Sequence, residues 1–195
     1  LVPAAEGSVR TRQALAVVTR RDTIVAWLAR SRQAQVNLHS IDIPELALRN
    51  LAALLPGDRT ISLLHVGLAR TTLLMVWKGE LCTSRRFDLN AHQLMTASPE
   101  AREQLLERLG LEVQRTADAF ERQFQAAALG DLWVTQESPS LALAVDLTRF
   151  VALPVQPFQF ADWLDLDTTS PLFDPERGID FATAIGAALR QEAAL

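Results

Sequence analysis

The chain has 195 residues, of which 49% are hydrophobic and 22% charged, and its formal net charge is −4. This composition is typical of a soluble globular protein of one domain or two small ones. The negative charge gives no general attraction to nucleic acid or to an anionic membrane. The sequence has no apolar run long enough to span a bilayer and no recognisable signal peptide. We therefore expect a cytoplasmic protein that reaches a membrane only through partners.

The first part of the chain predicts a strand, a helix and a second strand. The apolar run 14–19 predicts the first strand, and Asp22 can cap the helix that follows. Alternating apolar residues over 36–43 predict the second strand. Because a strand needs a neighbour to pair with, we expect further sequence upstream of residue 1.

A second helix begins at Pro44 and ends at Pro56-Gly57. Proline is favoured at the first position of a helix, and Glu45 in the first turn suits the helix dipole. The helix carries a stripe of four apolar residues, Leu48, Leu51, Ala52 and Leu55.

Residues 60–87 predict three consecutive antiparallel strands. Two short apolar runs, 61–66 and 71–77, are rich in strand formers, and 80–87 alternates like a half-buried strand. Lys78-Gly79 is a two-residue connection of the kind that tight hairpins use. The alternative is a buried helix broken at Gly67.

The remaining chain predicts alternating helices and strands. A polar connection over 88–99 leads to a long helix that begins at Glu100 and is ended by Gly130. Six residues form its apolar side: Leu105, Leu109, Val113, Thr116, Phe120 and Phe124. Further along the chain we predict a strand at 132–135, a helix at 139–150 capped by Ser138, a strand at 151–155 and a closing helix at 179–195.

The order of elements predicts the fold class. An antiparallel meander joined to alternating helices and strands is an α/β pattern with a mixed sheet. It fits half of an actin-like, ribonuclease-H-type fold, among others.

Four segments resemble one family in the same order. They are residues 40–51 (SIDIPELALRNL), 79–86 (GELCTSRR), 111–124 (LEVQRTADAFERQF) and 184–190 (AIGAALR). They are similar to segments of the PilM-like proteins of type IV pilus assembly, particularly the MshI proteins of the MSHA pilus. The similarity extends from about Ala14 to the carboxy terminus.

The resemblance implies an actin-like fold of two domains with a nucleotide cleft between them. It assigns residues 1–57 to a remnant of the first domain, 58–178 to the second domain and 179–195 to the closing helix. The first strands and first phosphate loop of the family have no counterpart in this chain. The resemblance also implies a place at the inner face of the bacterial inner membrane, where a PilM-like protein binds the cytoplasmic tail of a single-pass PilN-like protein.

The second phosphate loop departs from the pattern of an ATP site. An actin-type site uses a carboxylate and glycines on this hairpin, so that backbone amides and a metal ion can reach the phosphates. Here the positions read His65-Val-Gly-Leu-Ala-Arg70. Gly67, Arg70 and Thr71 are candidate remnants of the loop, and Arg70 is more simply an exposed turn residue.

The adenosine loop departs as well. The fold needs adjacent glycines after the strand at 132–135, and residues 136–140 contain none. We therefore expect no ATP hydrolysis, no catalytic residue and no bound cofactor, with ATP and Mg²⁺ as the alternative.

The sequence contains no local motif for nucleophilic catalysis or for metal binding. The one cysteine, Cys82, is interpreted as a packed residue. The three histidines are far apart in sequence, so we expect no metal site, and His65 is interpreted as a structural, hydrogen-bonded residue. The acidic stretch 162–167 lacks the ligands and the glycine of a calcium loop and is interpreted as a solvated helix end.

Two hypotheses follow. The first is a non-catalytic scaffold that binds pilus components through an apolar groove or an exposed strand edge, with a homo-oligomer as a further option. The second is a nucleotide-dependent switch whose phosphate loop lies upstream and is completed by Arg70 or Thr71. Four tryptophans are candidate anchors, of which we expect at least half in the core: Trp27, Trp77, Trp133 and Trp163.

Overall fold

The computed structural model describes residues 15–135, 142–165, 167, 169 and 181–190. Five strands form one sheet in the order β3-β2-β1-β4-β5. The helices described are α1 (Arg21–Gln33), α2 (Pro44–Ala52), α3 (Ala91–Thr96), α4 (Pro99–Gln123), α5 (Leu143–Leu147) and α7 (Ala182–Ala188), with a short 3-10 turn, η1 (Phe160–Asp162).

The three predicted antiparallel strands are confirmed and form one half of the sheet. They are β1 (Thr60–Val66), β2 (Thr71–Trp77) and β3 (Glu80–Phe87), paired antiparallel in sequence. Lys78 and Gly79 both have positive φ, 53° and 75°. Two positive φ values are what a two-residue hairpin turn needs to match the twist of its strands. The alternative of a broken helix is therefore wrong.

The other half of the sheet is parallel. β4 (Leu129–Thr135) pairs parallel to β1, and β5 (Val155–Phe158) pairs parallel to β4. The central strand β1 has a neighbour on both sides, and six of its seven residues are buried.

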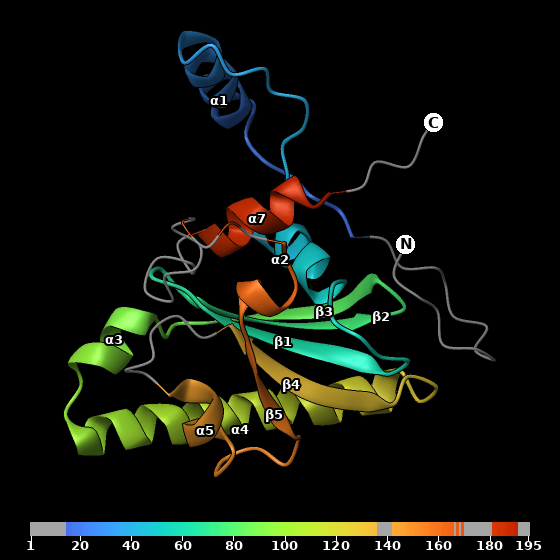
Figure 1. Cartoon of the computed structure of the whole chain (residues 1–195), viewed down its shortest axis with the longest axis vertical. Coiled ribbons are helices and arrows are strands. Elements are labelled where there is room, and N and C mark those ends of the chain that lie inside the picture. Colours follow the sequence, from blue (N-terminus) through green and yellow to red (C-terminus); the bar gives the residue numbers. More distant parts are fainter. Residues whose placement is uncertain (1–14, 136–141, 166, 168, 170–180, 191–195) are drawn as a thin grey trace.

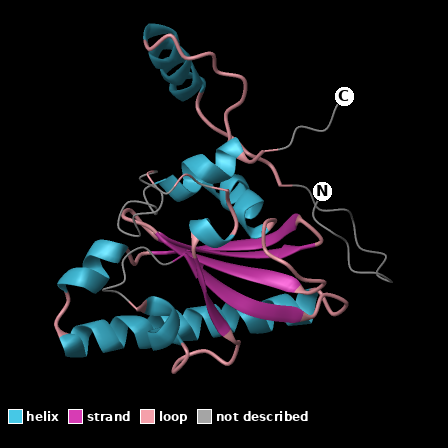
Figure 2. Ribbon diagram, in the orientation of Figure 1, coloured by secondary structure: helices cyan, strands magenta, loops and turns pink. Residues whose placement is uncertain are grey.

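Helices cover both faces of the sheet (Figures 1 and 2). On one face, α2 and α7 pack over a core that includes Leu48, Leu51 and Leu74. On the other, α4 and α5 pack over a larger core. The sequence grouped α2 with the first domain, and the structure packs it on this sheet, while the domain boundaries themselves stay a prediction. None of the described helices is long and apolar enough to cross a bilayer.

The long helix α4 begins where the sequence predicts. Ser98 caps it, with its hydroxyl accepting a hydrogen bond from the Ala101 N–H at 3.3 Å, and Pro99 takes the first position. The predicted apolar side faces the sheet, except that Leu105 is only partly buried. A Cβ on Gly110 would lie within 3.0 Å of Phe150, so this glycine allows the chain after α5 to approach the helix.

A second close approach joins α2 to α7. A Cβ on Gly186 would fall well inside 3.0 Å of the Ala47 carbonyl. The Asn50 side-chain amide donates a buried hydrogen bond of 2.8 Å to the Gly186 carbonyl. Two small residues and one hydrogen bond therefore fix the two helices in contact.

Residues 15–43, called the arm below, differ from the prediction. Residues 15–20 and 36–43 form no strand, and α1 begins at Arg21 so that Asp22 lies in its first turn instead of capping it. No residue of α1 is buried, and the helix stands away from the sheet (Figure 1). A strand is stable only when its backbone groups are paired. The described residues offer these two segments no neighbouring strand.

Several boundaries in the body, which we define as residues 44–190, also differ. The predicted polar connection contains α3, capped by Asn90 and Gln93 in a reciprocal pair of hydrogen bonds of 2.9 Å. α4 ends at Gln123, and Gly130 lies within β4. α5 is shorter than predicted, β5 begins at Val155 where the predicted strand ended, and α7 occupies the middle of 179–195. The predicted cap Ser138 lies outside the described residues.

Candidate functional site

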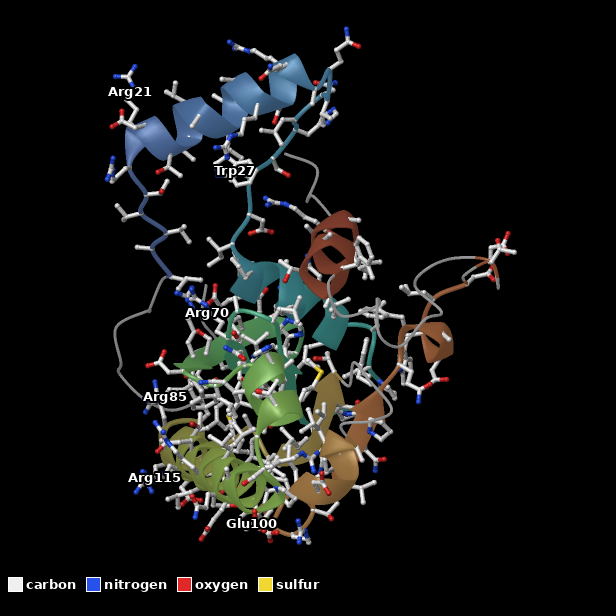
Figure 3. The ribbon with its side chains drawn as sticks, turned by 90° about the vertical axis from the view of Figure 1, so that its left-hand side faces the viewer. Arg21, Trp27, Arg70, Arg85, Glu100 and Arg115 are labelled. Atoms are coloured by element: carbon white, nitrogen blue, oxygen red, sulfur yellow. The ribbon has the colours of Figure 1, made fainter. Side chains whose placement is uncertain are left out.

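A cavity of about 640 Å³ lies at one end of the meander. Its wall comes from the loop between β1 and β2, the first turn of α2, the last residues of β3 and Thr183 at the start of α7. Gly67 and Arg70 of the predicted phosphate loop both line it, together with His65. Figure 3 shows Arg70 at the margin of the molecule.

The third predicted residue of that loop lies elsewhere. Thr71 is fully buried at the start of β2, and Thr72 lines the cavity in its place. Successive side chains of a strand point to opposite faces, so only one of two neighbouring threonines can face the cavity. The Thr71 hydroxyl finds no hydrogen-bond partner among the described residues.

The loop backbone makes its hydrogen bonds within the protein. The Gly67 N–H donates to the Arg70 carbonyl at 3.0 Å and thereby closes the turn. The Gly67 carbonyl accepts from the Ala91 N–H at 3.0 Å. A phosphate site needs amide hydrogens that point into the cavity. The glycine amide of this loop is already committed to the turn.

Packing explains why position 67 is a glycine. A Cβ there would lie 3.0 Å from the Arg70 carbonyl oxygen and 3.1 Å from His65 Nε2. These distances are tighter than nearly all real Cβ contacts. The glycine therefore has a structural reason that requires no ligand.

His65 is a hydrogen-bonded structural residue, as the sequence predicts. Its Nδ1 lies 2.9 Å from Thr135 Oγ1, and the Thr135 hydroxyl donates to the Leu64 carbonyl at 3.3 Å. A hydroxyl that donates its hydrogen elsewhere is left to accept one from Nδ1. Burial lowers the pKa of His65 to about 4. The imidazole is therefore neutral at physiological pH and supplies no charge to the cavity.

The carboxylate of the cavity wall comes from Glu45 on α2. Glu45 is 4% exposed, and its Oε1 accepts a charge-assisted hydrogen bond from Arg86 Nε on β3. Burial opposes its ionisation, but the hydrogen bond and the charge of Arg86, with a smaller effect of Arg70, lower the pKa of Glu45 below its usual value. Oε2 finds no partner among the described residues.

Sequence reasoning missed the pair of Glu45 and Arg86. The two residues are 41 positions apart, and each had a local explanation, one as a helix-dipole residue and the other as a strand residue. They meet because α2 packs beside the end of β3. No local pattern announces a contact that depends on tertiary packing.

These groups do not fit Mg-ATP. A metal ion at the phosphates needs a carboxylate that is free to bind it or to orient a water, and Glu45 is engaged by a guanidinium. The loop amide is closed into its own turn. Arg70 and Arg86 bring positive charge to the cavity. Among the described residues that line it, none is placed to activate a water molecule.

Other predicted residues lie apart from the cavity. Cys82 packs against the core beside α4, and burial raises the pKa of its thiol to about 11. Trp77 is buried, and Trp27 is 53% exposed on the arm. Trp133 and Trp163 are partly buried against the core and pack edge to face at 5.8 Å. The expectation that at least half of the tryptophans lie in the core is confirmed.

Comparison of the sequence with protein-family models and with curated proteins gives no match. The fold is similar to that of a chain in the "PilM-PilN type IV pilus biogenesis complex", with a TM-score of 0.68 and 21% identity over 87% of this chain and 58% of that one. It is also similar to the ethanolamine utilization protein EutJ from Carboxydothermus hydrogenoformans, with a TM-score of 0.56 and 16% identity over 88% of this chain and 62% of EutJ. The chain thus spans less than two thirds of either protein. The five-stranded mixed sheet with helices on both faces is an actin-like fold, as the sequence predicts.

Proposed function

We propose that this chain is a non-catalytic scaffold of type IV pilus assembly, of the PilM-like family and the MshI type. In this role it binds the cytoplasmic segment of a PilN-like membrane protein at the inner face of the inner membrane. The observation that carries the proposal is the likeness to a chain of the PilM-PilN complex along 87% of this sequence. The four sequence segments that resemble MshI proteins point in the same direction.

The chemistry of the cavity supports a scaffold rather than an ATPase. The pair of Glu45 and Arg86 and the closed turn at Gly67 give the protein structural contacts where a nucleotide enzyme keeps free groups. Function depends on such sites and not on the fold.

The arm supports a binding role. Nine large apolar side chains are exposed there: Leu15, Val17, Val18, Val25, Trp27, Leu28, Val36, Leu38 and Ile41. An exposed apolar surface of this kind is typical of an interaction site. We infer that it contributes to the groove that receives the partner, with Trp27 as its aromatic anchor, because tryptophan dominates many interfaces.

The test is calorimetric titration of the protein with a peptide that covers the cytoplasmic segment of a PilN-like protein. We expect binding, and we expect Trp27→Ala to weaken it by about thirtyfold or more, as for a central interface tryptophan. Leu111→Ala is the matched control, because Leu111 is 49% exposed on α4 in the body. No binding by the wild-type protein, or equal losses in both variants, would overturn the proposal.

One observation favours the alternative of a nucleotide-dependent switch. Gly67 and Arg70 line one cavity, as a phosphate loop requires, and Arg70 is exposed there. Under this alternative, Arg70→Ala abolishes binding of Mg-ATP and leaves the fold intact. Under the scaffold proposal there is no such binding to abolish.

A further inference from the structure

The outer strand β3 has a free edge. Its one neighbour in the described sheet is β2, and none of its eight residues is buried. A free edge presents backbone N–H and C=O groups that can pair with a strand of another chain. Natural proteins often protect such an edge with charges and bulges, and β3 has both. On this strand, however, the charges and the bulge are arranged so that the edge is complementary to itself.

A bulge divides β3 into two parts. Leu81 lies opposite Val76 on β2. Thr83 lies opposite the preceding Met75, which leaves Cys82 as an extra residue between them. Side chains alternate between the two faces along a regular strand, and one extra residue shifts this alternation by one position. Two residues that are an odd number of positions apart can therefore share a face when the bulge lies between them.

Glu80 and Arg85 share a face in this way. Glu80 lies opposite Trp77, and Arg85 lies opposite Leu73 further along β2. Cross-strand partners share a face, and both partners on β2 belong to the core beneath α4. The two charged side chains are exposed, and neither has an ion pair within the part of the chain that the structure describes. Figure 3 shows Arg85 at the margin of the molecule.

The backbone of β3 presents its free groups at two matching positions. A two-residue hairpin is closed by a hydrogen-bonded pair, here Trp77 and Glu80. Hydrogen-bonded and non-hydrogen-bonded pairs alternate along an antiparallel ladder, which makes the pairs of Leu81 and Ser84 with β2 non-hydrogen-bonded. The N–H and C=O groups of Leu81 and Ser84 therefore point away from β2, toward the free edge.

We propose that two copies of the chain pair antiparallel through β3 and join their sheets into one. In this dimer Leu81 of one copy lies opposite Ser84 of the other, which pairs the backbone groups that face the edge. Glu80 then lies opposite Arg85 on the α4 face, where opposite charges stabilise a cross-strand pair. A two-fold axis relates the copies, so each pair occurs twice. The edge belongs to the body, so this inference does not depend on the proposed role of the arm.

The agreement of three features identifies the occupant as a second copy. Backbone direction, side-chain face and charge all match in the one register that sets Glu80 opposite Arg85. A register that sets Glu80 opposite Arg86 would place the two charges on different faces, because Arg86 directly follows Arg85 in a regular part of the strand. In the proposed register Arg86 lies opposite Gly79, which has no side chain to disturb its ion pair with Glu45.

Sedimentation equilibrium tests whether the dimer exists. The wild-type protein should form a dimer that dissociates as it is diluted from about 1 mM. The Kd of the dimer should rise as salt is added, because the ion pairs between the copies are exposed. A protein that stays monomeric up to about 1 mM would overturn the proposal.

Charge reversal tests the register. Glu80→Arg and, separately, Arg85→Glu each set like charges opposite one another at two symmetric positions, so each should raise the Kd of the dimer by about tenfold. The variant that combines both changes sets opposite charges together again, and its Kd should return to within about threefold of the wild type. A merely structural role of either residue would not produce this rescue.

Arg149→Glu is the matched control for charge reversal. Arg149 is exposed beside α5, and α5 contacts β5 at the opposite edge of the sheet. This variant should keep the Kd of the wild type. A dimer that withstands both single reversals, or a combined variant that binds no more tightly than the single ones, would show that another surface joins the copies and would overturn the proposal.

Discussion

The arm and the body each contain a helix with apolar residues at helical spacing, and the two helices differ in what packs against them. α1 in the arm has no buried residue, whereas six of the nine residues of α2 in the body are buried. Of the two, α1 is the more polar helix and has the weaker apolar stripe. An apolar stripe therefore predicts a helix, but it does not predict whether other residues of the chain pack against that stripe.

The largest expected effect comes from replacing one leucine in each region by alanine. Leu51 on α2 is fully buried, and Leu28 on α1 is 36% exposed. Leu51→Ala should lower the free energy of unfolding by about 2–5 kcal/mol, because it leaves a cavity, whereas Leu28→Ala should cost under about 0.5 kcal/mol. Guanidinium denaturation measures both. Equal costs would show that the arm is packed as firmly as the body.

The contact of α2 with α7 gives the next effect. Gly186→Ala places a methyl group against the Ala47 carbonyl and should destabilise by about 1–3 kcal/mol. Ala184→Ser, on an exposed position of the same helix, should stay within about 0.5 kcal/mol. Stabilisation by Gly186→Ala, as helix propensity alone predicts, would show that α7 does not pack on α2.

Because His65 is buried in the body, we expect the free energy of unfolding to depend on pH. Its pKa falls from 6.5 to about 4 on folding, so the unfolded chain binds the proton at higher pH than the native protein does. The corresponding stability is present above pH 6.5 and is lost as the pH falls toward 4, by about 2 kcal/mol between pH 7 and pH 5. Urea denaturation of the wild type and of His65→Gln at both pH values measures this loss. If His65→Gln lost as much stability between pH 7 and pH 5 as the wild type does, the loss would not come from His65.

The smallest expected effect is the coupling energy of an ion pair, which we compare between the body and the arm. Arg86 is half exposed, so a double-mutant cycle of Glu45→Gln and Arg86→Gln should give a coupling of about 1 kcal/mol. The lowered pKa of Glu45 makes this coupling present above pH 4.5 and lost as the pH falls further. The pair of Arg20 and Asp22 in the arm, with side chains 84% and 86% exposed, should give no coupling above experimental error. Similar coupling energies in the two pairs would contradict the expected difference between the body and the arm.

The sequence predicts best what local patterns determine. Alternation and the two-residue turn at Lys78 and Gly79 determine the meander, and steps of three and four determine α4. The helix α3 could have been found from its cap, since Asn90 and Gln93 stand three positions apart at its start. The strands predicted in the arm could not be checked from the sequence, because pairing depends on a neighbour.

The candidate site shows the same division. The sequence singled out Gly67 and Arg70 and identified His65 as structural, and the structure places all three at one cavity. It could not reveal that Glu45 and Arg86 meet there, nor that the Gly67 amide is closed into its turn. These contacts depend on how α2, β3 and the loop pack together.

The most direct test of the scaffold proposal is thermal unfolding of the full-length protein with the PilN-like peptide and, separately, with 5 mM Mg-ATP. A ligand at a hundred times its Kd stabilises the native state by about 2.7 kcal/mol, which raises Tm by about 5–10 °C in a protein of this size. We expect the peptide to raise Tm and Mg-ATP to leave it unchanged. A rise with Mg-ATP that Arg70→Ala abolishes would contradict the scaffold and establish the nucleotide-dependent switch.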